Sequence, residues 1–170
     1  MSFSTPWSRR SALLALLPLP ALASPDWPAR GQGRMRVFGF SVYDIRLLAP
    51  APVQPERWAE QELALELRYS RALQGARIAE RSLQEMRRQG EIPDAQAKDW
   101  LAAMTQAFPD VVEGDRLSGL HHPVRGAQFW FNGQPRGPAL DAAFSRRFFG
   151  IWLHPATSAP DLRQQLLGRA

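Results

Sequence analysis

Three stretches in the last third of the chain decide the fold: FPDVVEGDRLSG at 108–119, FWFNGQPRG at 129–137 and FFGIWLHPATSAPDLRQQLLG at 148–168. The first predicts a strand over 111–120. The second predicts a hairpin with strands at 127–131 and 136–140, because Asn132-Gly133 is a strong type I′ turn signal. The third predicts helices, since its apolar residues recur at helical spacing.

Two helices are expected at this C-terminal end. Asp141 can cap the first of them with its side chain. One face of this helix carries large apolar residues: Phe144, Phe148, Ile151 and Trp152. Ser158, with Asp161 three residues later, resembles a capping box and predicts the start of the last helix, which Gly168 ends.

The first half of the chain shows the same two patterns. Residues 34–48 predict two short strands with a bend or bulge at Gly39. Residues 63–69 alternate leucines with smaller or polar side chains, which predicts a half-buried strand. Helical spacing then follows over 78–86, and Gly90 ends that run.

A second central helix is expected from Asp94, as its cap, to Pro109, which ends it. Its apolar stripe contains Ala97, Trp100, Leu101, Met104 and Phe108. The order is therefore strands, two helices, strands with a hairpin, and two helices. This order predicts an α+β fold with a large antiparallel sheet covered on one side by helices.

Residues 1–23 have the features of a secretory signal. Arg9 and Arg10 precede a short apolar core, and Ala21-Leu22-Ala23 is a small-x-small cleavage site before Ser24. We expect one mature domain, residues 24–170, in the periplasm or outside the cell, with no membrane span. The paired arginines also resemble a twin-arginine signal, so both export routes stay open.

Composition narrows the chemistry. The chain has no cysteine, which excludes disulfides, thiol catalysis and thiolate metal sites. Without Arg9 and Arg10 the formal charge falls from +5 to +3. The remaining arginines are scattered along the chain, which is typical of a solvated surface and does not favour nucleic-acid binding.

No common catalytic motif is present. The histidines are His121, His122 and His154, and they lack the spacing of a metal site. No G-x-S-x-G elbow occurs, although composition leaves a Ser-His-Asp arrangement open. We expect no metal and no cofactor. Glu85 lies beside the Met86 face of its helix and is expected to be solvated.

One residue combination favours ligand binding. Arg30 or Arg34, near the start of the sheet, could form a carboxylate or enolate clamp with the hydroxyl of Tyr43. The Trp100 and Met104 stripe could line a ligand pocket, or it could be ordinary core.

Several of these stretches, in their order and spacing, resemble the chalcone isomerase-like family, specifically its exported bacterial branch. The matches are VYDIRL at 42–47, LELRYSRALQG at 65–75, FPDVVEGDRL at 108–117, F-x-F-N-G at 129–133 and FFGIWL at 148–153. The resemblance covers roughly 31–168. It implies an open-faced β-sandwich with a ligand cleft between the sheet and the helices.

The resemblance also bears on activity. Plant enzymes of this family close a chalcone ring with an arginine, a strand threonine, and a tyrosine and an asparagine on a helix. Here these positions fall at Arg30, Tyr43, Gly75 and Ser82, so only the arginine matches. Fatty-acid-binding members pair an arginine with a tyrosine about a dozen residues later. Arg30 and Tyr43 reproduce that spacing, whereas Arg34 fits the local G-x-G-R pattern, so both arginines stay open.

Three functions follow as hypotheses. The first is a non-catalytic binder of a small apolar acid, such as a fatty acid, using Arg30 or Arg34, Tyr43, Trp100 and Met104. The second is an intramolecular lyase or isomerase acting on a chalcone-like enone. The third is an envelope protein-interaction module that uses the aromatic C-terminal helices as its surface.

Overall fold

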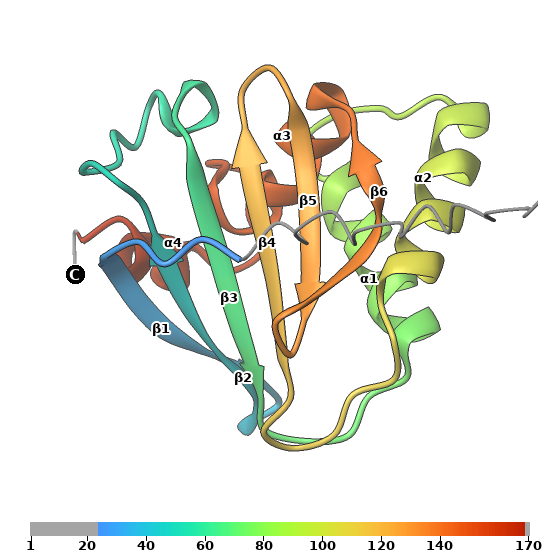
Figure 1. Ribbon diagram of the computed structural model, residues 1–170, viewed down its shortest axis with the longest axis horizontal. Helices are drawn as coiled ribbons and strands as arrows, with labels where there is room; N and C mark the ends of the chain where they lie inside the picture. The colour runs from blue at the N-terminus through green and yellow to red at the C-terminus, as the bar shows by residue number, and fades with distance from the viewer. Residues whose placement is uncertain (1–23, 169–170) are drawn as a thin grey trace, which may run out of the picture.

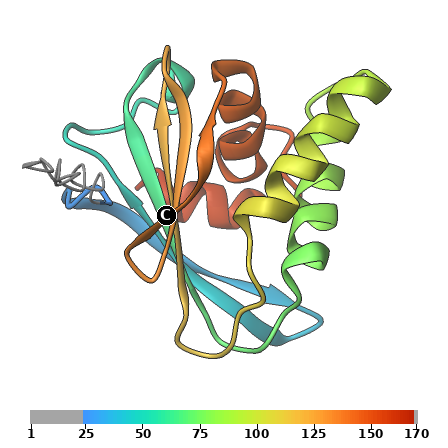
Figure 2. The same cartoon turned by 45° about the vertical axis from the view of Figure 1, so that its right-hand side comes forward.

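The computed structural model describes residues 24–168, and in this part of the chain six antiparallel strands form one sheet with four α-helices on a single face (Figures 1 and 2). The predicted signal, residues 1–23, lies outside the described residues. The predicted α+β class and the open-faced arrangement are confirmed.

The elements follow in a simple order along the chain. The strands are β1 (Ala29–Val37), β2 (Phe40–Leu48), β3 (Leu63–Tyr69), β4 (Arg116–His122), β5 (Gly126–Phe131) and β6 (Gln134–Leu140). The helices are α1 (Gly75–Arg87), α2 (Asp94–Ala107), α3 (Ala142–Leu153) and α4 (Pro160–Leu166), with a short 3₁₀ helix η1 (Trp58–Glu60) before β3.

The sheet is a meander in which every strand pairs with its neighbour in sequence, β1-β2-β3-β4-β5-β6. The helical pair α1 and α2 is inserted between β3 and β4, and α3 and α4 follow β6. Helix α3 packs on β4 and β5, whereas α4 returns to β1 at the far edge. The helix layer thus extends to both edges of the sheet.

Strand β3 shows why the sheet has two different faces. Leu63, Leu65, Leu67 and Tyr69 alternate along it and are all buried. Between them, Glu66 and Arg68 point to the outer face, where Arg46 of β2 donates to Glu66 at 2.7 Å. A period of two therefore places apolar side chains under the helices and charges in solvent, as expected from the sequence.

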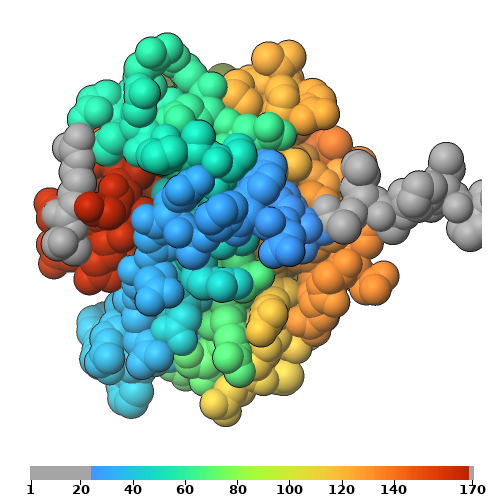
Figure 3. Space-filling model, turned by 60° about the vertical axis from the view of Figure 1, so that its left-hand side comes forward, coloured from blue at the N-terminus to red at the C-terminus, as the bar shows by residue number. Residues whose placement is uncertain are grey.

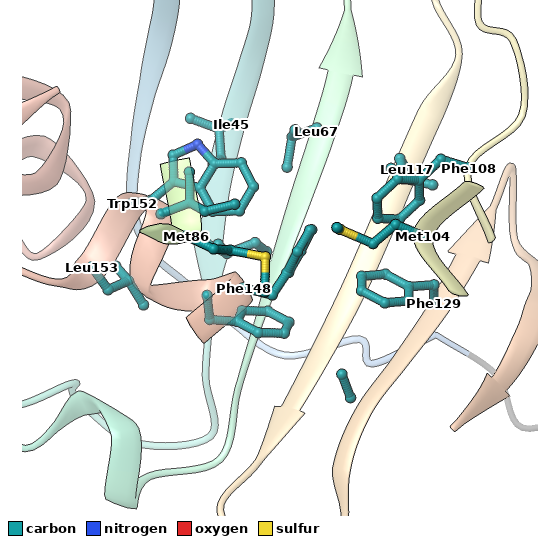
Figure 4. Packing of buried hydrophobic residues seen from close by; sticks show 14 of the residues in the cluster. Ile45, Leu67, Met86, Met104, Phe108, Leu117, Phe129, Phe148, Trp152 and Leu153 are labelled. Atoms are coloured by element: carbon teal, nitrogen blue, oxygen red, sulfur yellow. The ribbon is translucent and has the colours of Figure 1, made fainter. Parts of the chain in front are cut away.

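The aromatic helix α3 fills the centre of the core (Figure 4). The ring of Phe148 lies within 5.0–5.7 Å, centroid to centroid, of several other rings: Phe108, Phe129, Phe144, Phe149 and Trp152. All of them are buried. The third hypothesis requires this aromatic face to be a surface for a protein partner. In the structure, α3 packs this face against its own sheet and helices.

Local signals were confirmed at the hairpin and at α3. Asn132 and Gly133 both have positive φ, 48° and 81°, as a type I′ turn requires. The carboxylate of Asp141 accepts a hydrogen bond from the Phe144 amide at 2.8 Å and caps α3. Both features depend on neighbouring residues alone, which is why sequence reasoning found them.

Several predicted boundaries were wrong. Strand β1 starts at Ala29 and not at residue 34, because its pairing with β2 extends back to Ala29 opposite Leu48. Strand β4 starts at Arg116, and Val111 forms only an isolated bridge with Leu73. Pro93 is the N-cap of α2, so Asp94 is its first helical residue and caps nothing with its side chain. Ser158 does not cap α4 either, because Ala159 is the N-cap and Pro160 begins the helix.

Helix α4 approaches β1 closely because two glycines lie beneath it. A Cβ atom on Gly31 would collide with the backbone of Leu166, and one on Gly33 would collide with side chains of Leu162 and Gln165. The requirement for glycine is stricter at Gly31, since the backbone atoms above it cannot move aside as the flexible side chains above Gly33 can.

We expect Gly31→Ala to destabilise the fold by about 2 kcal/mol, because overpacking would push α4 away from β1. This corresponds to a loss of roughly 4–8 °C in the midpoint of thermal unfolding, measured by circular dichroism. Gln32→Ala, at the exposed neighbouring position, is the control and should change little. Equal stability of the two variants would contradict the close contact between α4 and β1.

Candidate functional site

A cleft of about 920 Å³ opens between the β1–β3 part of the sheet and helices α1, α3 and α4. Its volume lies in the range of small-molecule sites, about 300–1,000 Å³. Most of its wall is apolar or aromatic: Met35, Leu67, Ile78, Phe108, Phe148, Ile151, Trp152 and Leu162. The structure therefore contains the cleft that the family resemblance implied.

Tyr43 lies in the cleft wall and is held there by Trp152. The indole Nε1–H of Trp152 donates to the Tyr43 hydroxyl oxygen at 3.0 Å. The proton of that hydroxyl has no acceptor among residues 24–168, so it remains available to a ligand. Burial raises the pKa of Tyr43 to about 12, so the side chain stays protonated at neutral pH and acts as a donor.

Tyr69 supplies a second hydroxyl beside the first. It pairs with Tyr43 across β2 and β3, and the two rings meet edge to face with centroids 5.8 Å apart. Burial raises its pKa as well. Within the described part of the chain its hydroxyl makes no hydrogen bond, although Tyr69 is buried and lines the cleft.

Glu85 of α1 is a buried acidic group in the cleft wall, and it is not solvated as the sequence suggested. Its side chain is only 10% exposed, and Arg81 donates to its Oε1 at 2.6 Å. Its Oε2 lacks a hydrogen-bond partner in residues 24–168, since the nearest cation, Arg88 Nε, is 3.8 Å away. Glu85 lies seven residues after Ile78, on the same helical face, which turns it inward.

Arginines surround the opening of the cleft: Arg34, Arg36, Arg71, Arg77 and Arg81. The acidic residues in the wall are Glu85 and Asp161. A concave site with more cations than anions attracts a negatively charged ligand. Two of these arginines, Arg77 and Arg81, are ion-paired along α1 with Glu80 and Glu85.

The two arginines proposed for the clamp have other partners. Arg30 is absent from the cleft wall, and its guanidinium donates to the backbone carbonyls of Ala49 and Pro50 at 2.9 and 2.8 Å. Arg34 reaches the cleft rim, but its guanidinium pairs with Asp44 on the outer face of the sheet. Of the proposed pair, the structure brings Arg34 and Tyr43 to one cleft and leaves Arg30 at the other end of β1.

Trp100 and Met104 belong to the core and not to the cleft wall. The Trp100 ring packs edge to face on Phe144, with centroids 5.7 Å apart. Met104 is fully buried and lies beside Phe108 and Phe129 (Figure 4). The stripe left two interpretations open, a pocket lining and ordinary core. The structure places these side chains in ordinary core.

The sequence analysis missed Tyr69, Arg81 and Glu85. The alternation of β3 placed Tyr69 on the inner face, which was a usable signal. For Arg81 and Glu85 the signal was weaker, because a charged residue next to an apolar stripe is usually solvated. Only the position of α1 over the sheet shows that this stripe faces a hollow.

A serine–histidine pair exists, but neither residue lines the cleft. The Ser145 hydroxyl lies 2.6 Å from His121 Nδ1, and His121 Nε2 lies 3.0 Å from the Ala59 carbonyl oxygen. The carbonyl requires a proton on Nε2, so Ser145 donates to Nδ1. Both residues are buried, with 0% and 1% of their surface exposed, so no substrate can reach this hydroxyl. The pair joins α3, β4 and η1.

No group of three or more histidine or acidic residues is arranged to hold a metal ion within residues 24–168. None of the helices in this range is long and apolar enough to cross a bilayer.

Comparison with known proteins agrees with this architecture. A family model described as chalcone isomerase-like matches residues 29–168. This chain belongs to the chalcone isomerase-like family. A Haemophilus influenzae protein, described as uncharacterized, is 30% identical over 143 residues that cover 84% of this chain and 69% of that protein.

The crystal structure of a fatty-acid binding protein from Arabidopsis thaliana is also similar. It has a TM-score of 0.61 and 12% sequence identity, and the match covers 88% of this chain and 90% of that chain. At this identity the likeness shows the fold alone.

Two positions assigned by the family resemblance can now be located. Gly75 begins α1 against the backbone of Phe108 and Pro109, which leaves no room for a side chain. Ser82 lines the cleft, but its hydroxyl donates to the Ile78 carbonyl at 2.8 Å. Neither position offers the tyrosine or asparagine of the plant enzymes.

The His121 pair predicts a pH effect on stability. Burial lowers the pKa of His121 below its usual value of 6.5, so the unfolded chain binds a proton more readily than the folded one. Stability should therefore fall as pH drops through about 6.5 and flatten below the folded-state pKa. Denaturant midpoints between pH 4.5 and 8 measure this slope.

His121→Gln should flatten that slope and lower stability at pH 8 by about 1–3 kcal/mol, because the Ser145 and Ala59 contacts are disturbed. A contribution from His154 remains, since burial lowers its pKa too. A slope that is identical in the variant would show that His121 is not the responsible group.

Proposed function

We propose that this chalcone isomerase-like protein is an exported, non-catalytic binder of a small apolar acid of the fatty-acid type, held in the cleft between sheet and helices. The observation that carries the proposal is the cleft itself. It joins apolar walls, two tyrosine hydroxyl donors and a rim of arginines in about 920 Å³.

The walls suit a hydrocarbon chain. Leu67, Ile78 and Phe148 come from the sheet, α1 and α3, so apolar surface faces the cleft from three sides. Burial of an alkyl chain contributes about 0.8 kcal/mol per methylene. A short acyl chain therefore gains several kcal/mol from these walls, with no reacting group required.

The polar groups of the cleft suit the carboxylate of a fatty acid. Tyr43 already accepts from Trp152 and can give its own proton to a carboxylate oxygen. Tyr69 lies beside it with a second free donor. The rim arginines supply a positive field, which replaces the direct guanidinium contact expected from Arg30 or Arg34.

The same polar groups disfavour catalysis on an enone substrate. Ring closure of a chalcone needs a phenolate placed against the enone and a network of donors that stabilises it. Tyr43, with its pKa of about 12, is a poor base at neutral pH. Gly75 and Ser82 add no further hydrogen-bond donor. We therefore propose that the protein binds its ligand without catalysis.

The first test is uptake of dodecanoate by the full chain, followed by native mass spectrometry and calorimetry. We expect one acid per chain, bound about tenfold more weakly by Tyr43→Phe, because a hydrogen bond to a charged group contributes about 1.5–3 kcal/mol. Tyr43→Phe also deprives Trp152 of its acceptor, so thermal unfolding must be measured alongside.

Two further variants make this test specific. Tyr69→Phe removes a hydroxyl that makes no hydrogen bond among residues 24–168, so weaker binding in this variant cannot arise from a lost protein contact. Arg30→Ala is the matched control outside the cleft, and it should bind dodecanoate like the parent chain. Full affinity in both tyrosine variants would reject the clamp, and a lack of uptake across several fatty acids would reject the binder.

Glu85→Gln tests the charge of the ligand. Removal of a carboxylate from the cleft should strengthen dodecanoate binding roughly fivefold, about 1 kcal/mol, because like charges repel. Glu80→Gln, on the exposed side of α1, is the matched control and should have a smaller effect. Weaker binding in Glu85→Gln would mean that Glu85 accepts a hydrogen bond from the bound acid, and would contradict binding of the ligand as an anion.

A further inference from the structure

The turn between β1 and β2 presents three large apolar side chains to solvent. Phe38 is 97% exposed, Phe40 67% and Val37 47%. Figure 3 shows this light-blue hairpin projecting at the lower left of the molecule. We call these residues, 37–40, the hairpin tip. The core does not need them, since none of the three belongs to it.

The backbone of the hairpin tip makes Phe38 more unusual. Phe38 and Gly39 both have positive φ, 49° and 82°. The β5–β6 turn has the same conformation and uses Asn132-Gly133, the favoured residues for it. A phenylalanine is unfavourable at the first position of such a turn, and at 97% exposure no packing within the described residues compensates for it.

A fourth exposed apolar residue lies at the same end of the molecule. Val112 is 60% exposed and belongs to the loop before β4. That loop runs beside the β3 end, where Gly114 donates to Tyr69 and Ser70 donates to Val42 of β2. Figures 1 and 2 show the hairpin tip and this loop at one end of the molecule.

Arginines surround the hairpin tip. Arg36 precedes it in β1, and Arg71 follows β3 in the neighbouring loop; both line the opening of the cleft. Arg71 makes no hydrogen bond or ion pair with residues 24–168. The acidic side chains at this end include Asp44, which Arg34 neutralises, Asp110, which accepts from the Gly75 amide, Asp115, which accepts from Val112 and Asn132, and the exposed Glu113.

We propose that the hairpin tip docks this protein on an anionic lipid bilayer. Phe38 and Phe40 enter the headgroup region, where aromatic side chains are favoured. Arg36 and Arg71 contact lipid phosphates, an attraction that falls as salt rises. The geometry favours a bilayer over a protein partner, because Phe38 and Phe40 project singly from the turn and line no cleft.

This surface has a consequence for the cleft. Arg36 and Val37 belong both to the region of the hairpin tip and to the cleft wall. Docking would therefore bring the cleft opening next to the bilayer. The docking itself does not depend on what the cleft binds, and it can be tested without any ligand.

The absence of cysteine from the chain makes a position-specific test simple. Phe38→Cys and Val124→Cys each carry one environment-sensitive nitrobenzoxadiazole label. Val124 is 80% exposed and lies in the β4–β5 turn, at the opposite end of the molecule in Figure 1. Full-length protein is titrated with phosphatidylglycerol–phosphatidylcholine vesicles and with phosphatidylcholine vesicles alone.

We expect the label at position 38 to shift to the blue and brighten at least twofold with anionic vesicles, while the label at 124 stays unchanged. Phosphatidylcholine vesicles or 0.5 M salt should reduce the response at least fivefold. Equal responses at the two positions would mean that another segment mediates binding, and would overturn the proposal. An unchanged label at position 38 in the presence of anionic vesicles would also overturn the proposal.

Paired substitutions test the same surface by affinity. Arg36→Glu with Phe40→Ser should lower vesicle binding, measured by co-sedimentation, at least tenfold. Arg125→Glu with Val124→Ser is the matched control at the opposite end and should bind within twofold of the parent chain. Phe40 is exposed and outside the core, so unchanged thermal unfolding shows that the tip variant is folded. Equal binding by the two variants would refute the proposal.

Discussion

The packing of α3 against the sheet is the interaction on which the other features depend. A meander sheet of six strands can bury only one face, and that face needs a helix whose side chains fill the space above β4 and β5. Phe144 and Phe148 do this with stacked rings 5.6 Å apart. The same helix then delivers Trp152 to Tyr43. Core and cleft therefore share one element, and a shift of α3 would change both.

The cleft exists because the helix layer is uneven. Helix α4 descends onto β1 where Gly31 and Gly33 lack side chains, whereas Tyr43, Tyr69 and Trp152 line an open space between the sheet and α1. The polar groups in that space gain strength from their low-dielectric surroundings, and the unpartnered oxygen of Glu85 is costly for the same reason.

Sequence reasoning succeeded where a few neighbouring residues determine the structure. The alternation of β3, the Asn132-Gly133 turn and the Asp141 cap are of this kind, and together with the order of elements they define the fold. It failed where side-chain direction depends on distant elements. Arg30 has the right spacing from Tyr43, yet its guanidinium turns to the carbonyls of Ala49 and Pro50. The sequence predicted a solvated Glu85, and only the position of α1 over the sheet shows that it is buried.

The chain keeps the family architecture while its cleft lacks the residues of an isomerase. A catalytic cleft must hold a base, a donor network and a substrate in one fixed geometry. Here Gly75 has no space for a side chain, Ser82 bonds to its own helix, and Tyr43 is fixed as a proton donor by its raised pKa. The groups that the cleft does offer, namely an apolar volume, oriented hydroxyls and positive charge, fit the proposed binder. These features demand less exact placement than catalysis does.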